Sequence, residues 1–153
     1  MRLSVVAPAS VALLLGIGWT CREIAFASQK AGEVTSRTVT IDQAPMRPYE
    51  DQGKPAGKIG FYLMGETPSS SKFVTGRFTL DPGKTPHAPH THVEEEVMIV
   101  ESGHGEIFCD GKTTKVGPGS VMYTTPNAPH GITNTGDEPL TFYFVKWAAK
   151  AGR

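Results

Sequence analysis

The chain has 153 residues, with 15 basic and 15 acidic side chains and a formal net charge of zero. This length suits one domain with one hydrophobic core. The balanced charge gives no reason to expect nucleic acid or an anionic membrane surface as a partner. With 17 glycines and 12 prolines, the composition argues against long helices and favours short strands joined by tight turns.

Residues 1–27 have the features of a signal peptide. Arg2 provides the positive start, and residues 3–19 are almost wholly apolar or small. Ala25-Phe26-Ala27 then forms an A-x-A cleavage site ahead of Ser28. We therefore predict an exported protein, periplasmic or secreted, whose mature chain begins at Ser28 and is not attached to a membrane.

Two alternatives to cleavage at this site are weaker. An uncleaved anchor would need an apolar run of about 20 residues, whereas this run is shorter and contains Pro8. A lipoprotein would use Cys21, but Gly18-Trp19-Thr20 is a poor context for lipid attachment. Loss of the leader leaves Cys109 as the one cysteine, so no internal disulfide can form. We interpret Cys109 as a small core residue rather than a reactive thiol.

The mature chain is predicted to contain an N-terminal arm (28–57), one β-domain (58–148) and a short tail (149–153). The arm is polar and rich in loops, with a possible edge strand at 38–41. The domain has short apolar runs separated by turn signals, the pattern of a sandwich or barrel. Its predicted strands are 59–64, 73–80, 97–100, 106–109, 112–116, 121–124, 131–134 and 140–147.

Two of these segments carry further structural signals. Asp110-Gly111 separates two strands and favours a type I′ hairpin turn, because both residues tolerate positive φ. The last strand, 140–147, is apolar on both faces. It could lie between the core and a subunit interface, so we expect a homodimer in which it and the N-terminal arm cover exposed edges.

The most informative side chains are three histidines and a glutamate. His90 and His92 are two residues apart, so on a strand their imidazoles would project from the same face. Glu96 follows four residues later, and His130 comes from a separate predicted strand. Imidazole and carboxylate together are ligands for manganese, iron, nickel, copper or zinc.

The two segments around these residues resemble the signature motifs of the cupin superfamily. The first motif has two histidines separated by one residue, then a glutamate and a closing glycine; the second has a glycine, a proline, a histidine and an asparagine. The matching residues here are His90, His92, Glu96 and Gly103, and then Gly119, His130 and Asn134, with Pro126 one residue from the usual position of the proline.

The resemblance implies an all-β, single-domain cupin barrel of the jelly-roll type, following the signal peptide. It also implies one divalent metal ion bound by His90, His92, Glu96 and His130. In the second motif Asn127 stands at a position where the family usually has glycine, and the proline is shifted by one residue. Asparagine is the next-best residue at left-handed backbone angles, so we expect an altered turn and an intact ligand.

Such a site has more than one use. With an octahedral manganese, iron or nickel ion, two adjacent positions stay open for a small anionic substrate such as a carboxylate, a hydroxy acid or a sugar acid. The expected chemistry is then oxidation, decarboxylation or isomerisation. With tetrahedral zinc the four ligands would form an inert structural site. The alternative to an enzyme is therefore a non-catalytic cupin that binds a sugar or another small ligand.

Residues near the predicted ligands have less certain roles. His87 could act as an acid or base, although an exposed loop position is the simpler interpretation. Glu94 or Glu95 could hold a ligating imidazole, although a solvated loop face is the simpler reading. The sequence predicts structural roles for the remaining candidates: His104 as an exposed turn residue, Tyr123, Phe142 and Tyr143 as core, and Asn134 as a structural group rather than a ligand.

Overall fold

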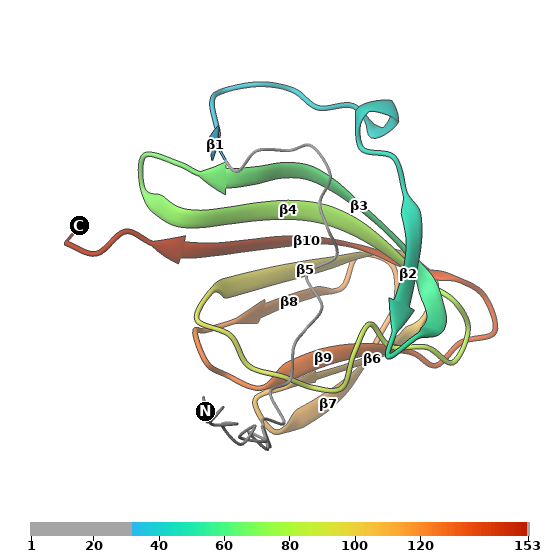
Figure 1. Cartoon of the computed structure of the whole chain (residues 1–153). Helices are drawn as coiled ribbons and strands as arrows, with labels where there is room; N and C mark the ends of the chain where they lie inside the picture. The colour runs from blue at the N-terminus through green and yellow to red at the C-terminus, as the bar shows by residue number, and fades with distance from the viewer. Residues whose placement is uncertain (1–31, 153) are drawn as a thin grey trace, which may run out of the picture.

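The structure is a computed structural model that describes residues 32–152 of the chain (Figure 1). Its described part is all-β apart from one 3-10 turn, η1 (Ile41–Gln43). The strands in chain order are β1 (Gly32–Glu33), β2 (Arg47–Asp51), β3 (Lys54–Glu66), β4 (Ser70–Leu80), β5 (Glu95–Ser102), β6 (Gly105–Cys109), β7 (Lys112–Val116), β8 (Val121–Thr124), β9 (His130–Asn134) and β10 (Leu140–Ala149).

These strands form two sheets that face each other, an arrangement consistent with a jelly roll (Figure 1). The large sheet has the order β1-β3-β4-β10-β5-β8, with β2 paired to β3. The small sheet has the order β7-β6-β9. All pairs are antiparallel except β1 with β3.

The hydrophobic core lies between the sheets and follows from the alternation of each strand. On β10, Leu140, Phe142 and Phe144 point inward, and all three are buried. Phe142 stacks on Phe78 of β4, with ring centroids 5.7 Å apart. Burial of a side chain of this size contributes about 1.5–3 kcal/mol. The cluster consists of Phe78, Leu80, Met98, Ile107, Met122, Ile132, Leu140, Phe142 and Phe144.

The loop between β4 and β5 extends the small sheet along the free edge of β9. The Gly83 N–H donates to the Asn134 carbonyl, and the Asn134 N–H donates to the Lys84 carbonyl. Further along, His90 and His130 exchange two backbone hydrogen bonds of 3.0 Å and form an isolated antiparallel bridge. The loop therefore acts as an irregular fourth strand, which fixes its position against β9.

Two tight turns have the backbone angles expected from the sequence. Asp110 and Gly111, which join β6 to β7, both have positive φ, at 46° and 83°. Asn127 has φ 63°, so asparagine does occupy the left-handed position that the family usually fills with glycine. The Asn127 N–H also donates to the His92 carbonyl at 2.8 Å. This turn therefore ties the segment before His130 to the segment that carries His92.

The eight predicted strands are present, several of them longer than expected, but the N-terminal arm differs. Residues 38–41 form no strand and lead into η1, in which Gln43 and Thr40 close a capping box. Instead, β2 and the start of β3 lie within the predicted arm, and β3 begins at Lys54. The pairing of β2 with β3, which has a register shift between Tyr49 and Glu50, was not predicted because Pro48 and Pro55 argue against strands there. The predicted signal peptide and the Ser28 start lie outside the described residues. Within residues 32–152, none of the helical structure has the length and apolar character needed to cross a membrane.

Candidate metal centre

Four polar side chains meet between the two sheets, near the end of the sandwich where β10 ends. Glu96 lies at the start of β5 in the large sheet, and His130 lies at the start of β9 in the small sheet. His90 and His92 come from the loop that runs along β9. The two sheets and their connecting loop therefore all contribute to one site.

The expectation that His90 and His92 lie on one strand was wrong. His90 makes a single bridge and His92 has no strand pairing. Pro86 and Pro89, which lack a backbone N–H, precede them and prevent a regular ladder. The two imidazoles still converge, with ring centroids 5.2 Å apart. Their convergence depends on the loop and its bridge to β9 rather than on strand alternation.

The three histidines form a group that could hold a metal ion. Each offers one ring nitrogen, and these atoms of His90, His92 and His130 all lie within 4.8 Å of one another. Ring centroids are 4.8 Å apart for His90 and His130, and 4.7 Å apart for His92 and His130. His130 is 1% exposed, so this end of the site is shielded from water.

Backbone carbonyls fix the tautomer of two of these rings. His92 Nδ1 lies 2.9 Å from the Glu94 carbonyl, and His130 Nδ1 lies 2.9 Å from the Ala128 carbonyl. A carbonyl oxygen only accepts, so both Nδ1 atoms carry a proton. In both residues Nε2 faces the centre of the site, where it donates a hydrogen bond to Glu96; once that proton is lost, the Nε2 lone pair is free to bind a metal ion. This is the arrangement in which proteins present imidazole to a metal ion.

Glu96 contacts two of the three histidines. Its Oε2 atom lies 2.9 Å from His92 Nε2 and 3.0 Å from His130 Nε2. Burial raises the pKa of Glu96, but the hydrogen bonds from His130 and His92 outweigh burial and bring the pKa to about 2. Glu96 is 4% exposed, so a carboxylate that is charged and buried stands at the point where the two Nε2 atoms meet.

His90 differs from the other two rings. Its Nδ1 is buried and has no hydrogen-bond partner among the described residues. Burial lowers the pKa of His90 to about 4, with further repulsion from His87, His130 and His92. The ring is therefore neutral near pH 7 and has a buried nitrogen without a partner. The carbonyl-fixed tautomers, the charged Glu96 and this nitrogen together fit a divalent cation.

Two other predicted roles close to the site change in the structure. Glu94 does not lie on a solvated face, because one of its oxygens is 3.5 Å from His92 Nδ1 and the other pairs with Lys72 at 3.0 Å. His87 is partly buried rather than fully exposed, and its ring lies 4.0 Å from that of His90. The contacts of Glu94 with His92 and of His87 with His90 depend on the path of the β4–β5 loop. The sequence did not predict this path.

Glu95 and two tyrosines lie on the opposite face of the large sheet. Glu95 accepts hydrogen bonds from Tyr123 at 2.6 Å and from Trp147 at 3.1 Å. Tyr123 is exposed, and Tyr143 alternates with the inward Phe142 and Phe144, so neither tyrosine is part of the core. Phe142 is in the core as predicted.

Three further residues behave as the sequence indicated. Asn134 is 0% exposed and binds only backbone groups, at Leu80, Glu138 and Gly136. Cys109 is a free thiol on β6 that packs against the core. His104 is exposed.

Sequence reasoning missed Lys146 and Lys72, which lie beside the site. Lys146 pairs in register with Glu96 across β10 and β5, and Lys72, near the start of β4, pairs with Ala148. Lys146 is the one charged residue in the run 140–147. A charged residue in an otherwise apolar strand could have pointed to Lys146. The strand register that puts Lys146 opposite Glu96 depends on tertiary structure and cannot be found in this pattern.

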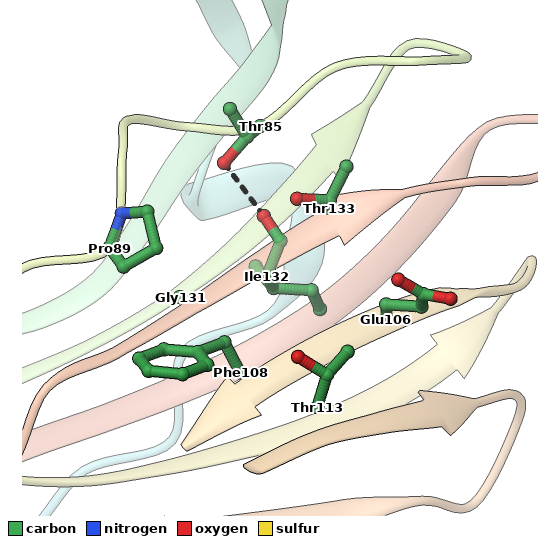
Figure 2. A pocket seen from close by; sticks show the side chains of 8 residues that line it. All are labelled: Thr85, Pro89, Glu106, Phe108, Thr113, Gly131, Ile132 and Thr133. Carbon is green, nitrogen blue, oxygen red and sulfur yellow. Dashed lines mark hydrogen bonds between the residues drawn. The ribbon is translucent and has the colours of Figure 1, made fainter. Parts of the chain in front are cut away.

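A shallow pocket of about 120 Å³ lies elsewhere, on the outer face of the small sheet (Figure 2). Thr85 lies at its rim and donates a 2.8 Å hydrogen bond to the Ile132 carbonyl (Figure 2). Glu106, Phe108 and Thr113 line the other side. None of the three site histidines lines this pocket, so it is separate from the candidate metal centre.

Comparison with known proteins agrees with the geometry. A family profile described as a cupin domain matches residues 76–146, which include the three histidines and Glu96. Residues 76–146 form a cupin domain. The four polar site residues lie within this domain, whereas β1, β2 and β3 lie outside the matched residues.

Solved structures support the fold. A predicted oxalate decarboxylase from Thermotoga maritima is 22% identical with a TM-score of 0.61, over 73% of this chain and 99% of that one. An uncharacterized conserved protein with a double-stranded β-helix domain from Klebsiella pneumoniae is 27% identical with a TM-score of 0.57, over 77% and 95%. KdgF from Halomonas is 16% identical with a TM-score of 0.59, over 73% and 94%. The shared feature is the cupin fold.

Proposed function

We propose that this cupin is a metal-dependent enzyme that acts on a small anionic substrate by oxidation, decarboxylation or isomerisation. The observation that carries the proposal is the convergence of three imidazoles and one buried carboxylate. The proposed ligands are His90, His92, Glu96 and His130, and the proposed ion is a divalent transition metal such as manganese or iron. When bound, such an ion supplies Lewis-acid chemistry to a coordinated substrate oxygen.

The charge of the site supports an anionic substrate. Three neutral imidazoles add no charge, and Glu96 cancels one of the two positive charges of the ion. The shielded position of His130 and Glu96 strengthens the remaining electrostatic attraction, because little water screens it. The chain's own residues therefore have two roles: they hold the ion, and they leave a net positive centre for a carboxylate.

The test begins with metal content. Purified protein should contain about one transition-metal ion per chain by mass spectrometry. Metal-loaded protein is then incubated with panels of small carboxylates, hydroxy acids and sugar acids, with and without oxygen, and each compound's consumption is followed. Turnover that is lost on chelation and restored by one metal supports the proposal. A fully loaded protein that converts none of these compounds contradicts it.

A non-catalytic binding role is the second candidate. It is favoured by the contacts of Glu96 with both His92 and His130, because four close protein ligands complete a tetrahedral zinc site. In that case the bound metal is zinc, and added carboxylates leave its coordination unchanged. X-ray absorption at the metal edge, with and without a carboxylate, separates the two candidates.

We also propose export and self-association. Cleavage before Ser28 predicts that N-terminal sequencing of protein from its native host begins at that residue. Self-association is supported by exposed apolar side chains on the outer face of the large sheet, which include Ile99, Val121 and Tyr123. A second copy would cover this face next to β10. Light scattering at micromolar concentration should give twice the mass of the mature chain.

A further inference from the structure

Lys146 lies on the inner face of the sandwich beside the candidate metal centre. On β10 it is two residues after Phe144, which is buried in the core, so alternation gives both the same face. Across the sheet it is directly opposite Glu96 on β5 and Val74 on β4. Its side chain is partly buried. A cationic side chain is therefore placed at the inner edge of the cluster of histidines.

The ammonium group of Lys146 has no carboxylate within ion-pair distance among the described residues, unlike its basic neighbours. Lys72 pairs with Glu94 at 3.0 Å, Arg77 pairs with Glu101 at 2.9 Å, and Lys150 pairs with Glu66 at 3.2 Å. This charge without a partner lies beside the site, because Lys146 is directly opposite Glu96.

The charges around the site then match a dianion. A divalent ion and Glu96 leave one positive charge, and Lys146 adds a second. Lys72 and Glu94 neutralise each other. Partly buried cations are costly unless an opposite charge binds them. The metal centre and Lys146 would then provide two neighbouring positive charges. These favour a ligand that has two negative groups over a ligand that has one.

We propose that Lys146 is a substrate-binding residue, and that the substrate class is short dicarboxylates with one carboxylate at the metal and the other at the Lys146 ammonium. Directly opposed residues of antiparallel strands have Cα atoms about 4.5–5.5 Å apart. Since Lys146 is directly opposite the proposed ligand Glu96, only a few bonds can separate the two carboxylates. This inference rests on the proposed metal-dependent function.

The experiment measures binding rather than turnover. Metal-loaded protein is titrated calorimetrically near neutral pH with malonate and succinate, and with their monomethyl esters, which carry one charge less. A charge-assisted contact in a partly buried site should make the better diacid bind about tenfold more tightly than its ester. Lys146→Met should remove this preference, and Lys146→Arg should keep it. Lys150→Met, which removes a lysine just beyond the same strand, should leave it unchanged.

The variants also test whether the diacid uses the metal alone. Compared with the diacid, the monomethyl ester lacks one carboxylate that can bind the metal as well as one charge. A diacid preference that survives in Lys146→Met therefore comes from the metal and overturns the inference. Lys146→Gln repeats the test with a polar side chain if the methionine variant does not fold. Equal affinities of wild-type protein for diacid and ester overturn the inference without any variant.

Metal content, measured before each titration, separates the two hypotheses. A wild-type protein that holds one metal ion but does not prefer diacids contradicts the role of Lys146 and leaves the metal centre intact. A wild-type protein that holds no metal contradicts both. Metal content at the wild-type level in Lys146→Met is the expected result, because Lys146 is not a proposed ligand.

Discussion

His130 and Asn134 lie four residues apart on β9, are both buried and both point between the sheets, yet their surroundings differ. The Asn134 side chain makes three hydrogen bonds, all to backbone groups at one end of the sandwich. His130 instead lies among two other imidazoles and a carboxylate, and the neighbouring His90 has a buried nitrogen without a partner. Buried polar groups that are fully satisfied stabilise a fold, whereas an unsatisfied one such as His90 Nδ1 has a nitrogen available for a water molecule or an ion.

The largest expected effect is at the histidine end. The double variant His92→Ala, His130→Ala should reduce bound metal to background, because only His90 and Glu96 remain. The loss of affinity should exceed the roughly 10–100-fold caused by losing an outer partner of a ligand. Metal per chain is measured by mass spectrometry, and circular dichroism checks that the β-fold is retained. Wild-type metal content in this variant would contradict the proposed difference between the His130 end and the Asn134 end of β9.

At the Asn134 end of β9, a substitution should lower the stability of the fold rather than the metal content. Asn134→Ala leaves the Leu80 and Glu138 carbonyls without their side-chain donor, so we expect the free energy of unfolding to fall by about 3 kcal/mol. Urea denaturation of the metal-free protein measures this fall. Metal content at a urea concentration where the variant is folded should equal that of wild type. A variant as stable as wild type, or one that folds but loses metal, would contradict the comparison.

The pH dependence of metal binding follows from His130. Burial lowers the pKa of His130, but hydrogen bonds with Glu96 and the Ala128 carbonyl outweigh burial and raise the pKa above 6.5. Metal must displace the proton on Nε2, so the apparent affinity should rise about tenfold per pH unit below the pKa of His130 and flatten above it. Calorimetry between pH 6 and 8 measures the slope. His90 adds no pH dependence between pH 6 and 8, because its pKa is about 4. An affinity independent of pH over this range would argue against His130 as a ligand.

The same pair gives a test in the metal-free protein. The lowered pKa of Glu96 contributes stability that is present above 4.5 and lost as the pH falls towards 2. The raised pKa of His130 contributes stability that is present below 6.5 and lost as the pH rises through its pKa. The contribution of the pair should therefore be greatest between pH 4.5 and 6.5. Glu96→Gln should lower the unfolding free energy most within this window and remove the falls below and above it, as measured by urea denaturation.

The smallest effect distinguishes two adjacent glutamates. Glu94→Gln removes the charge beside His92 Nδ1, so metal affinity should fall by about tenfold. Glu95→Gln is the matched control, because Glu95 contacts Tyr123 and Trp147 on the outer face. Its metal affinity should stay within about twofold of wild type, within ordinary calorimetric error. Equal losses in both variants would show that the effect is general electrostatics and not the contact with His92.

The sequence alone determined the fold class, the strands from residue 59 onward and the identity of the candidate ligands. Alternation and turn residues such as Asp110-Gly111 are local features, and the candidate ligands followed from the resemblance of their two segments to the cupin motifs. Asn127 shows the same point, since its left-handed angle follows from its place in the motif. These predictions needed no knowledge of which strands pair.

Tertiary structure alone decided how those residues meet and which others join them. His90 and His92 converge through a loop bridged to β9, a contact between residues 40 positions apart that no local pattern encodes. The register of β10 against β5 places Lys146 opposite Glu96, and the β4–β5 loop brings Glu94 between Lys72 and His92. Strand pairing and loop path depend on the packing of the whole core, because a shift of one residue would turn every side chain to the other face.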